Sequence, residues 1–263
     1  MNGFYNHKPV KIAKVPTEYE GEAYAHIMQY DESIISHLDN GKKVNDFYAH
    51  RYSDGFPMDI DLNGNLTKAK ELTVLFLKSL HLEYELDLAC VRIYFSGSKG
   101  FHIIFPSILF NISPHPDLEA KLKLLAKRLI SDHPIEKAGA VDLPFYCRNR
   151  WIRIPNSIHP KSKLYKIPLT WSELTTLSIN EIQLLAKSPK YLDSVISYSE
   201  LSINSGLSKI YQDCLNQPSK HSHVDVNQLL SHGVDEGERG DMAFQLSRGL
   251  RDQGATENEI RYE

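Results

Sequence analysis

The middle of the chain alternates apolar and polar positions in the two-residue period of β-strands. The segment 56–62 (FPMDIDL) alternates apolar with acidic residues, and 91–95 (VRIYF) and 101–105 (FHIIF) have the composition of two further strands. The turn GSKG joins these last two, which predicts a hairpin with a glycine-rich tip. Shorter strands are expected at 141–142 and 151–154.

Helical periodicity occurs between the predicted strands. Apolar residues recur on one side of 67–80 and of 117–131, which predicts two amphipathic helices. Strands interleaved with helices in this way predict an α+β fold with a split-βαβ sheet. An N-terminal α/β layer, mixed and mostly helical over 17–50, is expected to precede that sheet.

The sequence pattern becomes mainly helical after about residue 170. Ser178 followed by Glu181 predicts a capping box that opens a helix. We therefore expect an α+β domain over 1–175 and a helical C-terminal region over 176–263. A further helical pattern covers 236–253, and the chain stops soon after the apparent start of another helix, so we expect a fragment of a longer protein.

Bulk composition places the chain among globular proteins. It has 263 residues, of which 41% are hydrophobic and 24% charged, and no apolar run approaches the roughly 20 residues of a membrane helix. The N-terminus lacks the apolar centre of a signal peptide, so we expect a cytoplasmic protein. Cys90, Cys147 and Cys214 form no CxxC pair, so neither a structural zinc site nor a disulfide is expected.

Charge is unevenly distributed. The net charge of −3 argues mildly against nucleic-acid binding. Residues 143–172 nevertheless contain no acidic residue, which creates a local positive field. The cations of this basic segment are Arg148, Arg150, Arg153, Lys161, Lys163 and Lys166.

Three aspartates are the first candidates for a functional role. Asp59 and Asp61 are two residues apart in a predicted strand, so both carboxylates point to one face and repel unless a proton or cation bridges them. Hard divalent ions such as Mg²⁺ and Mn²⁺ prefer such oxygen ligands, and Asp142 in the apolar context GAVDLPF is a third candidate ligand. Solvent-facing aspartates on an edge strand, or a turn or helix-cap role for Asp142, are the structural alternatives.

The hairpin SGSKGFH and the basic segment supply candidate phosphate contacts. Glycines let backbone N–H groups approach a phosphate, and Ser96, Ser98, Lys99 and His102 carry hydrogen-bond donors. The guanidinium groups of the basic segment match phosphate geometry. A polar hairpin tip with a structural histidine, followed by a solvated basic loop, is the alternative.

These motifs together resemble the archaeo-eukaryotic primase superfamily. DID at 59–61, SGSKGFH at 96–102, VD at 141–142 and RNRWIR at 148–153 follow one another in that family's order. The resemblance is narrower to the primase–polymerase branch of plasmids, phages and bacterial mobile or CRISPR-associated elements, and it covers about residues 20–170. Gly100 departs from some relatives, which carry serine two positions before the histidine.

The resemblance implies a DNA primase and DNA polymerase, that is, a nucleotidyltransferase that uses two Mg²⁺ or Mn²⁺ ions. The implied metal ligands and catalytic residues are Asp59, Asp61 and Asp142. The implied nucleotide-binding residues are Ser96, Ser98, Lys99, His102, Arg150, Arg153 and Lys166. The implied DNA contacts are Arg148, Lys161 and Lys163. Expected partners are a single-stranded DNA template, a primer strand, NTP or dNTP, and a helicase or other replication or defence protein, with no membrane.

Three other functions remain open at this stage. One is a catalytically inactive, primase-like replication initiator that binds DNA. Another is a glycosyltransferase that uses the DxD pair, and a third is a single-strand-binding module. The C-terminal stretch 233–260 resembles the opening of a helical primase C-terminal domain. The sequence leaves open whether NTP or dNTP is preferred, and whether this chain starts primers or only extends them.

Overall fold

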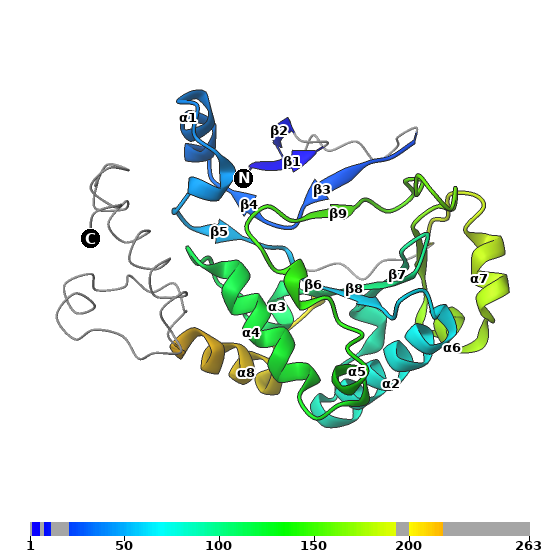
Figure 1. Cartoon of the computed structure of the whole chain (residues 1–263). Coiled ribbons are helices and arrows are strands. Elements are labelled where there is room, and N and C mark those ends of the chain that lie inside the picture. The colour runs from blue at the N-terminus through cyan, green and yellow to red at the C-terminus, as the bar shows by residue number, and fades with distance from the viewer. Residues whose placement is uncertain (1, 6–7, 12–20, 193–199, 218–263) are drawn as a thin grey trace, which may run out of the picture. The chain divides into compact units, whose positions relative to one another are not determined.

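The computed structural model describes residues 2–5, 8–11, 21–192 and 200–217 (Figure 1). Residues 1–217 form one compact unit, and residues 218–263 form a second unit that lies outside the described residues. The first unit is a mixed α+β fold, which confirms the predicted class. The helical predictions for 236–253 and 233–260 lie outside the described residues.

A first sheet is built largely from N-terminal strands. Its order is β5-β4-β1-β3-β9, with β2 paired to β1, and all of its pairings are antiparallel. The strands are β1 (Asn2–Tyr5), β2 (Lys8–Lys11), β3 (Tyr24–His26), β4 (Gln29–Tyr30), β5 (Arg51–Tyr52) and β9 (Trp151–Arg153). Within the described residues 21–50, the predicted mixture of helices and strands is confirmed, but fewer than half of the residues are helical. Between residues 21 and 50 the only helices are α1 (Ser33–Asp39) and the 3-10 turn η2 (Val44–Asp46).

A second sheet carries the strands that the sequence predicts, in the order β10-β7-β8-β6. These strands are β6 (Gly55–Asp61), β7 (Arg92–Phe95), β8 (Gly100–Pro106) and β10 (Ile167–Leu169). The first three match the predicted segments to within one residue. Both β6 and β7 run antiparallel to β8. They are therefore parallel to each other, with β8 between them.

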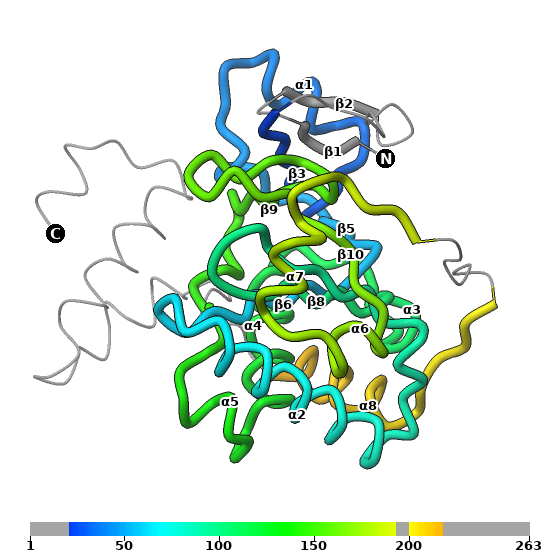
Figure 2. Tube along the Cα trace, turned by 90° about the vertical axis from the view of Figure 1, so that its right-hand side faces the viewer, coloured from blue at the N-terminus to red at the C-terminus, as the bar shows by residue number. Residues whose placement is uncertain are grey.

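Helices cover one face of the second sheet. The long helix α2 (Leu66–Tyr84) connects β6 to the 3-10 turn η3 (Leu88–Cys90) and β7, and it buries Leu72 and Phe76 against the core. The remaining helical elements are α3 (Ser107–Phe110), α4 (Leu118–Ile130), α5 (Pro134–Lys137), η4 (Leu143–Phe145), α6 (Trp171–Thr176), α7 (Ile179–Leu185) and α8 (Ser205–Asn216). Figures 1 and 2 show the second sheet between the first sheet on one side and α2, α4 and α5 on the other.

Local sequence signals account for several helix ends. The capping box predicted at Ser178 is confirmed: its hydroxyl accepts the Glu181 N–H, and the Glu181 carboxylate accepts the Ser178 N–H. Thr170 and Glu173 form a second capping box at the start of α6. The domain boundary predicted at residue 175 falls within α6. The helices α6, α7 and α8 all belong to the same compact unit as the two sheets.

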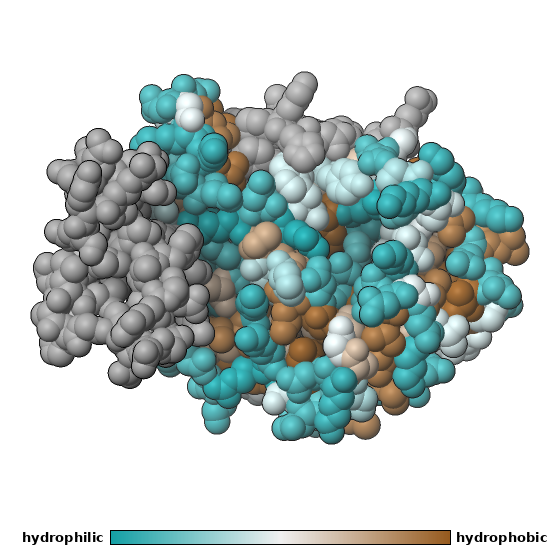
Figure 3. Space-filling view, in the orientation of Figure 1, coloured by the Kyte–Doolittle hydropathy of each residue, from teal (hydrophilic) through white to brown (hydrophobic). Residues whose placement is uncertain are grey.

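Apolar surface is limited on the face that Figure 3 shows. This face is mostly hydrophilic, with apolar patches in its lower centre and at the right (Figure 3). Leu184 and Leu185 of α7 are among the exposed apolar residues. Among the described helices, none combines the length and the apolar character needed to cross a membrane.

Candidate active site

Three carboxylates come together on one face of the second sheet. Ile60 is fully buried in the core, so its neighbours Asp59 and Asp61 face away from α2 and toward the first sheet. The other edge of β6 pairs with the chain that precedes η4, because Ile60 bridges Val141 and the Asp142 N–H donates to the Asp59 carbonyl at 3.0 Å. Asp142 is thereby placed beside Asp59, although 83 positions separate them in the sequence.

The proximity of these carboxylates has an electrostatic consequence. Burial, together with the neighbouring charges of Asp142 and Asp61, raises the pKa of Asp59 from 3.8 to about 6, while Arg150 and Lys166 oppose the rise. The Asp59 side chain keeps 22% of its surface exposed, so it can still reach a ligand. A carboxylate that is both buried and repelled by like charges gains from any cation that binds there.

The β7–β8 hairpin lies against the strand that carries the carboxylates. The Ser96 hydroxyl accepts the N–H groups of Ser98 (3.4 Å) and Gly100 (3.3 Å), which shapes the tip. Gly100 pairs with Asp61, and a Cβ at Gly100 would stand 1.9 Å from the Ile60 carbonyl oxygen. This position is therefore closed to any side chain while β6 and β8 are paired in this way.

His102 stands in the same row of the sheet as Asp59. The two residues are paired across β6 and β8, and His102 Nε2 lies 3.5 Å from Asp59 Oδ1. Burial lowers the pKa of His102 well below 6.5, and the charges of Lys166, Arg153 and Arg150 lower it further, so its ring is neutral at pH 7. Its Nδ1 is buried and has no hydrogen-bond partner within the part of the chain that the structure describes.

Two cations of the basic segment reach this face from β9 and from just before β10. Lys166 is 1% exposed, its Nζ donates to the Arg153 carbonyl at 2.7 Å, and it lies 4.7 Å from the Tyr94 ring centre. Burial, together with the charge of Arg153, lowers the pKa of Lys166 from 10.5 to about 7, and the Asp59 carboxylate opposes this shift. The Arg153 guanidinium donates to the Ile158 carbonyl at 2.9 Å and lies 4.9 Å from the centre of the Tyr24 ring.

An open cavity of about 440 Å³ unites most of the predicted site. Of the predicted residues, it is lined by Asp59, Asp61, Ser96, Ser98, Lys99, His102, Arg153 and Lys161. Four lining residues were not among the predicted site residues: Tyr24, Gly100, His159 and Pro160. Tyr24 enters only through the pairing of β3 with β9, which no local pattern reveals. A larger cavity of about 750 Å³ lies beside the C-terminal end of α2, but it contains none of the predicted site residues.

Arg150 is engaged with one of the carboxylates. Its Nη2 lies 2.7 Å from Asp142 Oδ2, and its guanidinium lies 4.9 Å from the Phe145 ring centre. Asp142 precedes η4 but does not cap it with its side chain. Carboxylate oxygens suit Mg²⁺ or Mn²⁺ chemically. Among the described residues, however, no three His, Cys, Asp or Glu side chains are grouped so that they could hold a metal ion.

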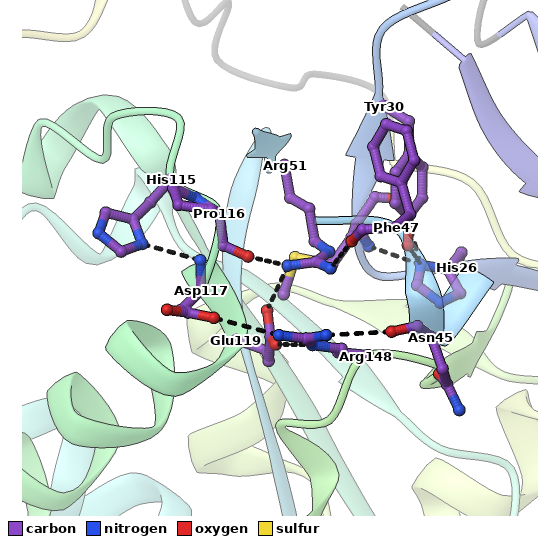
Figure 4. Close-up of polar contacts among 11 residues, drawn as sticks. His26, Tyr30, Asn45, Phe47, Arg51, His115, Pro116, Asp117, Glu119 and Arg148 are labelled. Atoms are coloured by element: carbon purple, nitrogen blue, oxygen red, sulfur yellow. Dashed lines mark hydrogen bonds and ion pairs between the residues drawn. The ribbon is translucent and has the colours of Figure 1, made fainter. Parts of the chain in front are cut away.

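Arg148 is held in a different place. Its guanidinium donates to Glu119 (2.9 Å), Asp117 (3.2 Å) and the Asn45 carbonyl (3.0 Å), and Glu119 also pairs with the fully buried Arg51 at 3.3 Å (Figure 4). This network joins β5 and α4 to the start of the basic segment. The structure therefore does not bring Arg148 into the cavity. Lys163, an exposed residue with φ of 61°, also lies outside the cavity lining.

Comparisons with known proteins find likeness among solved structures. No protein-family model matches this sequence, and no curated protein matches it. Among solved structures, the chain is similar to the polymerase domain from Mycobacterium tuberculosis Ligase D in complex with DNA, with 18% sequence identity and a TM-score of 0.40. The match covers 62% of this chain and 58% of that chain, which is less than two thirds of the latter.

Proposed function

We propose that this chain is the catalytic core of a DNA primase–polymerase, which joins nucleotides on a single-stranded DNA template. The observation that carries the proposal is the cavity in which Asp59 and Asp61 face Ser98, Lys99, His102 and Arg153. Acidic groups able to hold metal ions and donors able to hold phosphates thus share one space. The parallel pair β6 and β7, joined by α2 with β8 between them, supports a split-βαβ sheet of the primase kind.

Asp59, Asp61 and Asp142 would hold two Mg²⁺ or Mn²⁺ ions. When bound, such ions activate a 3′-hydroxyl and stabilise the departing pyrophosphate. The chain's own contribution is preorganisation, because backbone pairing fixes Asp59 next to both His102 and Asp142 before any ligand arrives. Release of Arg150 from Asp142 would free a guanidinium for the nucleotide.

The hairpin and β9 would bind the triphosphate. Ser98 and Lys99 line the cavity, whereas the Ser96 hydroxyl accepts two N–H groups of its own turn. We therefore assign Ser96 to the shape of the hairpin and Ser98 to phosphate. The neutral His102 ring can donate one N–H to the nucleotide, and the buried Lys166 holds the Arg153 backbone through a 2.7 Å hydrogen bond.

The template would lie along the exposed turn that carries Lys161 and Lys163. Contacts from lysines to phosphates give affinity and register without reading sequence. Arg148 is left out of this surface because its guanidinium is already bonded to Glu119, Asp117 and Asn45.

A non-catalytic replication initiator is the second candidate. The observation that favours it is the 2.7 Å contact between Arg150 and Asp142, which would neutralise a metal ligand permanently if it never opened. DNA binding without metal-dependent synthesis would identify this alternative.

Primer extension with a matched pair of variants tests the proposal. Asp61→Asn should abolish extension on a primed template while leaving the fold intact, because it removes one proposed metal ligand from a partly buried strand end without changing the side-chain volume. The control Asp46→Asn changes an exposed aspartate in η2, outside the cavity, and should extend like the unmodified protein. Extension by Asp61→Asn at the rate of the control would disprove the metal assignment.

A further inference from the structure

A groove between α2 and α8 lies away from the proposed active site. Its volume is about 580 Å³, and it is lined by the C-terminal end of α2, by the chain into η3 and by 200–206, which leads into α8. Figures 1 and 2 show α2 and α8 on the side of the second sheet opposite to the first sheet. Asp59 and Asp61 face the first sheet, so this α2–α8 groove is separate from the catalytic cavity.

The α2–α8 groove exposes apolar side chains. Leu82 on α2 is 80% exposed, the largest fraction among the exposed large apolar side chains in the described part of the chain, and Ile203 on the facing segment is 49% exposed. Leu86 and Leu109 line the same groove but are buried, so they form an apolar floor. Exposed apolar side chains beside an apolar floor are typical of a surface that another molecule covers.

Hydrogen bonds hold the two walls of the groove together. The Asn204 N–H donates to the Leu109 carbonyl at 3.0 Å, and the Asn204 side-chain amide donates to the Tyr84 carbonyl at 2.7 Å. Asn204 also caps α8, because its Oδ1 accepts the Leu207 N–H at 3.1 Å. A Cβ at Gly206 would stand 2.7 Å from the Tyr84 ring, so the start of α8 packs directly against the end of α2. A groove that is formed in advance lowers the cost of ordering on binding.

Every charged side chain that lines the groove is acidic. The lining contains no Lys, Arg or His, and its exposed carboxylates belong to Glu83, Glu85, Asp87 and Glu200. The first three lie at the C-terminal end of α2, where the helix dipole adds a partial negative charge. These charges together attract a cationic ligand and repel the phosphates of a nucleic acid.

We propose that the α2–α8 groove binds a peptide segment of a partner protein in which Lys or Arg residues stand beside apolar ones. The apolar side chains would cover Leu82 and Ile203, and the cationic groups would pair with the carboxylates. A small cation would leave Leu82 uncovered, and an acidic peptide or DNA would be repelled. This inference does not depend on the proposed function, and the partner would bind without obstructing the catalytic cavity.

Selection from a phage-displayed library of random peptides tests this inference. The unmodified chain serves as bait, and the double variant Leu82→Ser, Glu200→Lys removes peptides that bind elsewhere. Both side chains are exposed, so we expect unchanged thermal stability, and Glu200→Lys alone replaces the double variant if that does not fold. The control double variant Asp39→Lys, Leu184→Ser changes exposed residues of α1 and α7 outside the groove and should bind the selected peptides normally.

We expect the selected peptides to combine Lys or Arg with apolar residues. In fluorescence anisotropy they should bind the Leu82→Ser, Glu200→Lys variant at least tenfold more weakly than the unmodified chain, and added salt should weaken binding to the unmodified chain. Selection of no peptide, selection of acidic or uncharged peptides, or equal affinity for the variant would each overturn the inference. A dimer of the unmodified chain in sedimentation velocity that the variant abolishes would also overturn it, because a second copy would then occupy the groove. All of these outcomes leave the proposed function standing.

Discussion

Asp59→Asn should stabilise the protein at neutral pH while destroying its activity. The pKa of Asp59 is raised from 3.8 to about 6 by burial and by the neighbouring carboxylates. This rise corresponds to about 3 kcal/mol of unfavourable free energy for the ionised group in the folded state. Asparagine has almost the same volume and no charge. We therefore expect the free energy of unfolding to increase by about 2 kcal/mol at pH 7.5, since some polar contacts of the carboxylate are lost.

The pH dependence of this gain follows from linkage. A carboxyl group whose pKa is raised by folding retains its proton longer in the folded protein, so its penalty is absent below about pH 4, grows between pH 4 and 6, and is complete above pH 6. Urea unfolding followed by circular dichroism, without divalent ions, should show a large gain for Asp59→Asn at pH 7.5 and almost none at pH 4. The exposed-site control Asp46→Asn should show no such difference.

Magnesium should reverse the order of stability. An ion that binds only the folded state increases the free energy of unfolding of the unmodified protein, and at ion concentrations above Kd this increase grows with the logarithm of the concentration. Asp59→Asn should lose this response. The reasoning would be refuted if Asp59→Asn were less stable than the unmodified protein at pH 7.5, or if its effect were the same at both pH values.

Three further predictions concern the surroundings of the carboxylates. Arg150→Gln should bind Mn²⁺ about fivefold more tightly, because it frees the Asp142 oxygen that Arg150 contacts at 2.7 Å, and weaker binding in a Mn²⁺ titration would contradict this. Lys166→Met should raise the urea midpoint more at pH 6 than at pH 9. With a folded-state pKa of about 7, the buried ammonium of Lys166 destabilises the folded protein fully below pH 7 and progressively less above it. An equal shift of the midpoint at both pH values would exclude this cause. Gly100→Ala should lower the free energy of unfolding by about 3 kcal/mol, because its Cβ would lie 1.9 Å from the Ile60 carbonyl oxygen. An unchanged urea midpoint would contradict this and show that β6 and β8 can move apart without loss of stability.

Local patterns in the sequence were sufficient for the second sheet. The alternation around Asp59 and Asp61 and the hairpin glycines depend on neighbours within a few residues, and so does the Ser178 capping box. These elements were predicted to within one residue because strand alternation and helix capping are local effects. Asp142 was a candidate third ligand from its apolar context, but its place beside Asp59 depends on long-range backbone pairing that no local pattern predicts.

Long-range pairing limited the rest of the prediction. Strands β3 and β4 contain three and two residues, too few to show a period, and β3 becomes a strand through its partners β1 and β9. The environment of Arg148 depends on Glu119 and Asp117, about 30 positions earlier, which no spacing rule connects to it. His159 lines the cavity because the turn between β9 and β10 closes through its own backbone hydrogen bonds, an arrangement that no local sequence pattern predicts.

Nucleotide synthesis on DNA tests the central claim most directly. Labelled nucleotides and Mg²⁺ or Mn²⁺ would be supplied with a single-stranded template, in parallel with and without a primer. We expect products that depend on the template and on the metal ion, at least on the primed template, and we expect Asp59→Ala to make none. Products without a primer would show that this chain also starts primers. Intact DNA binding with no product on either template would contradict the account and identify a non-catalytic initiator.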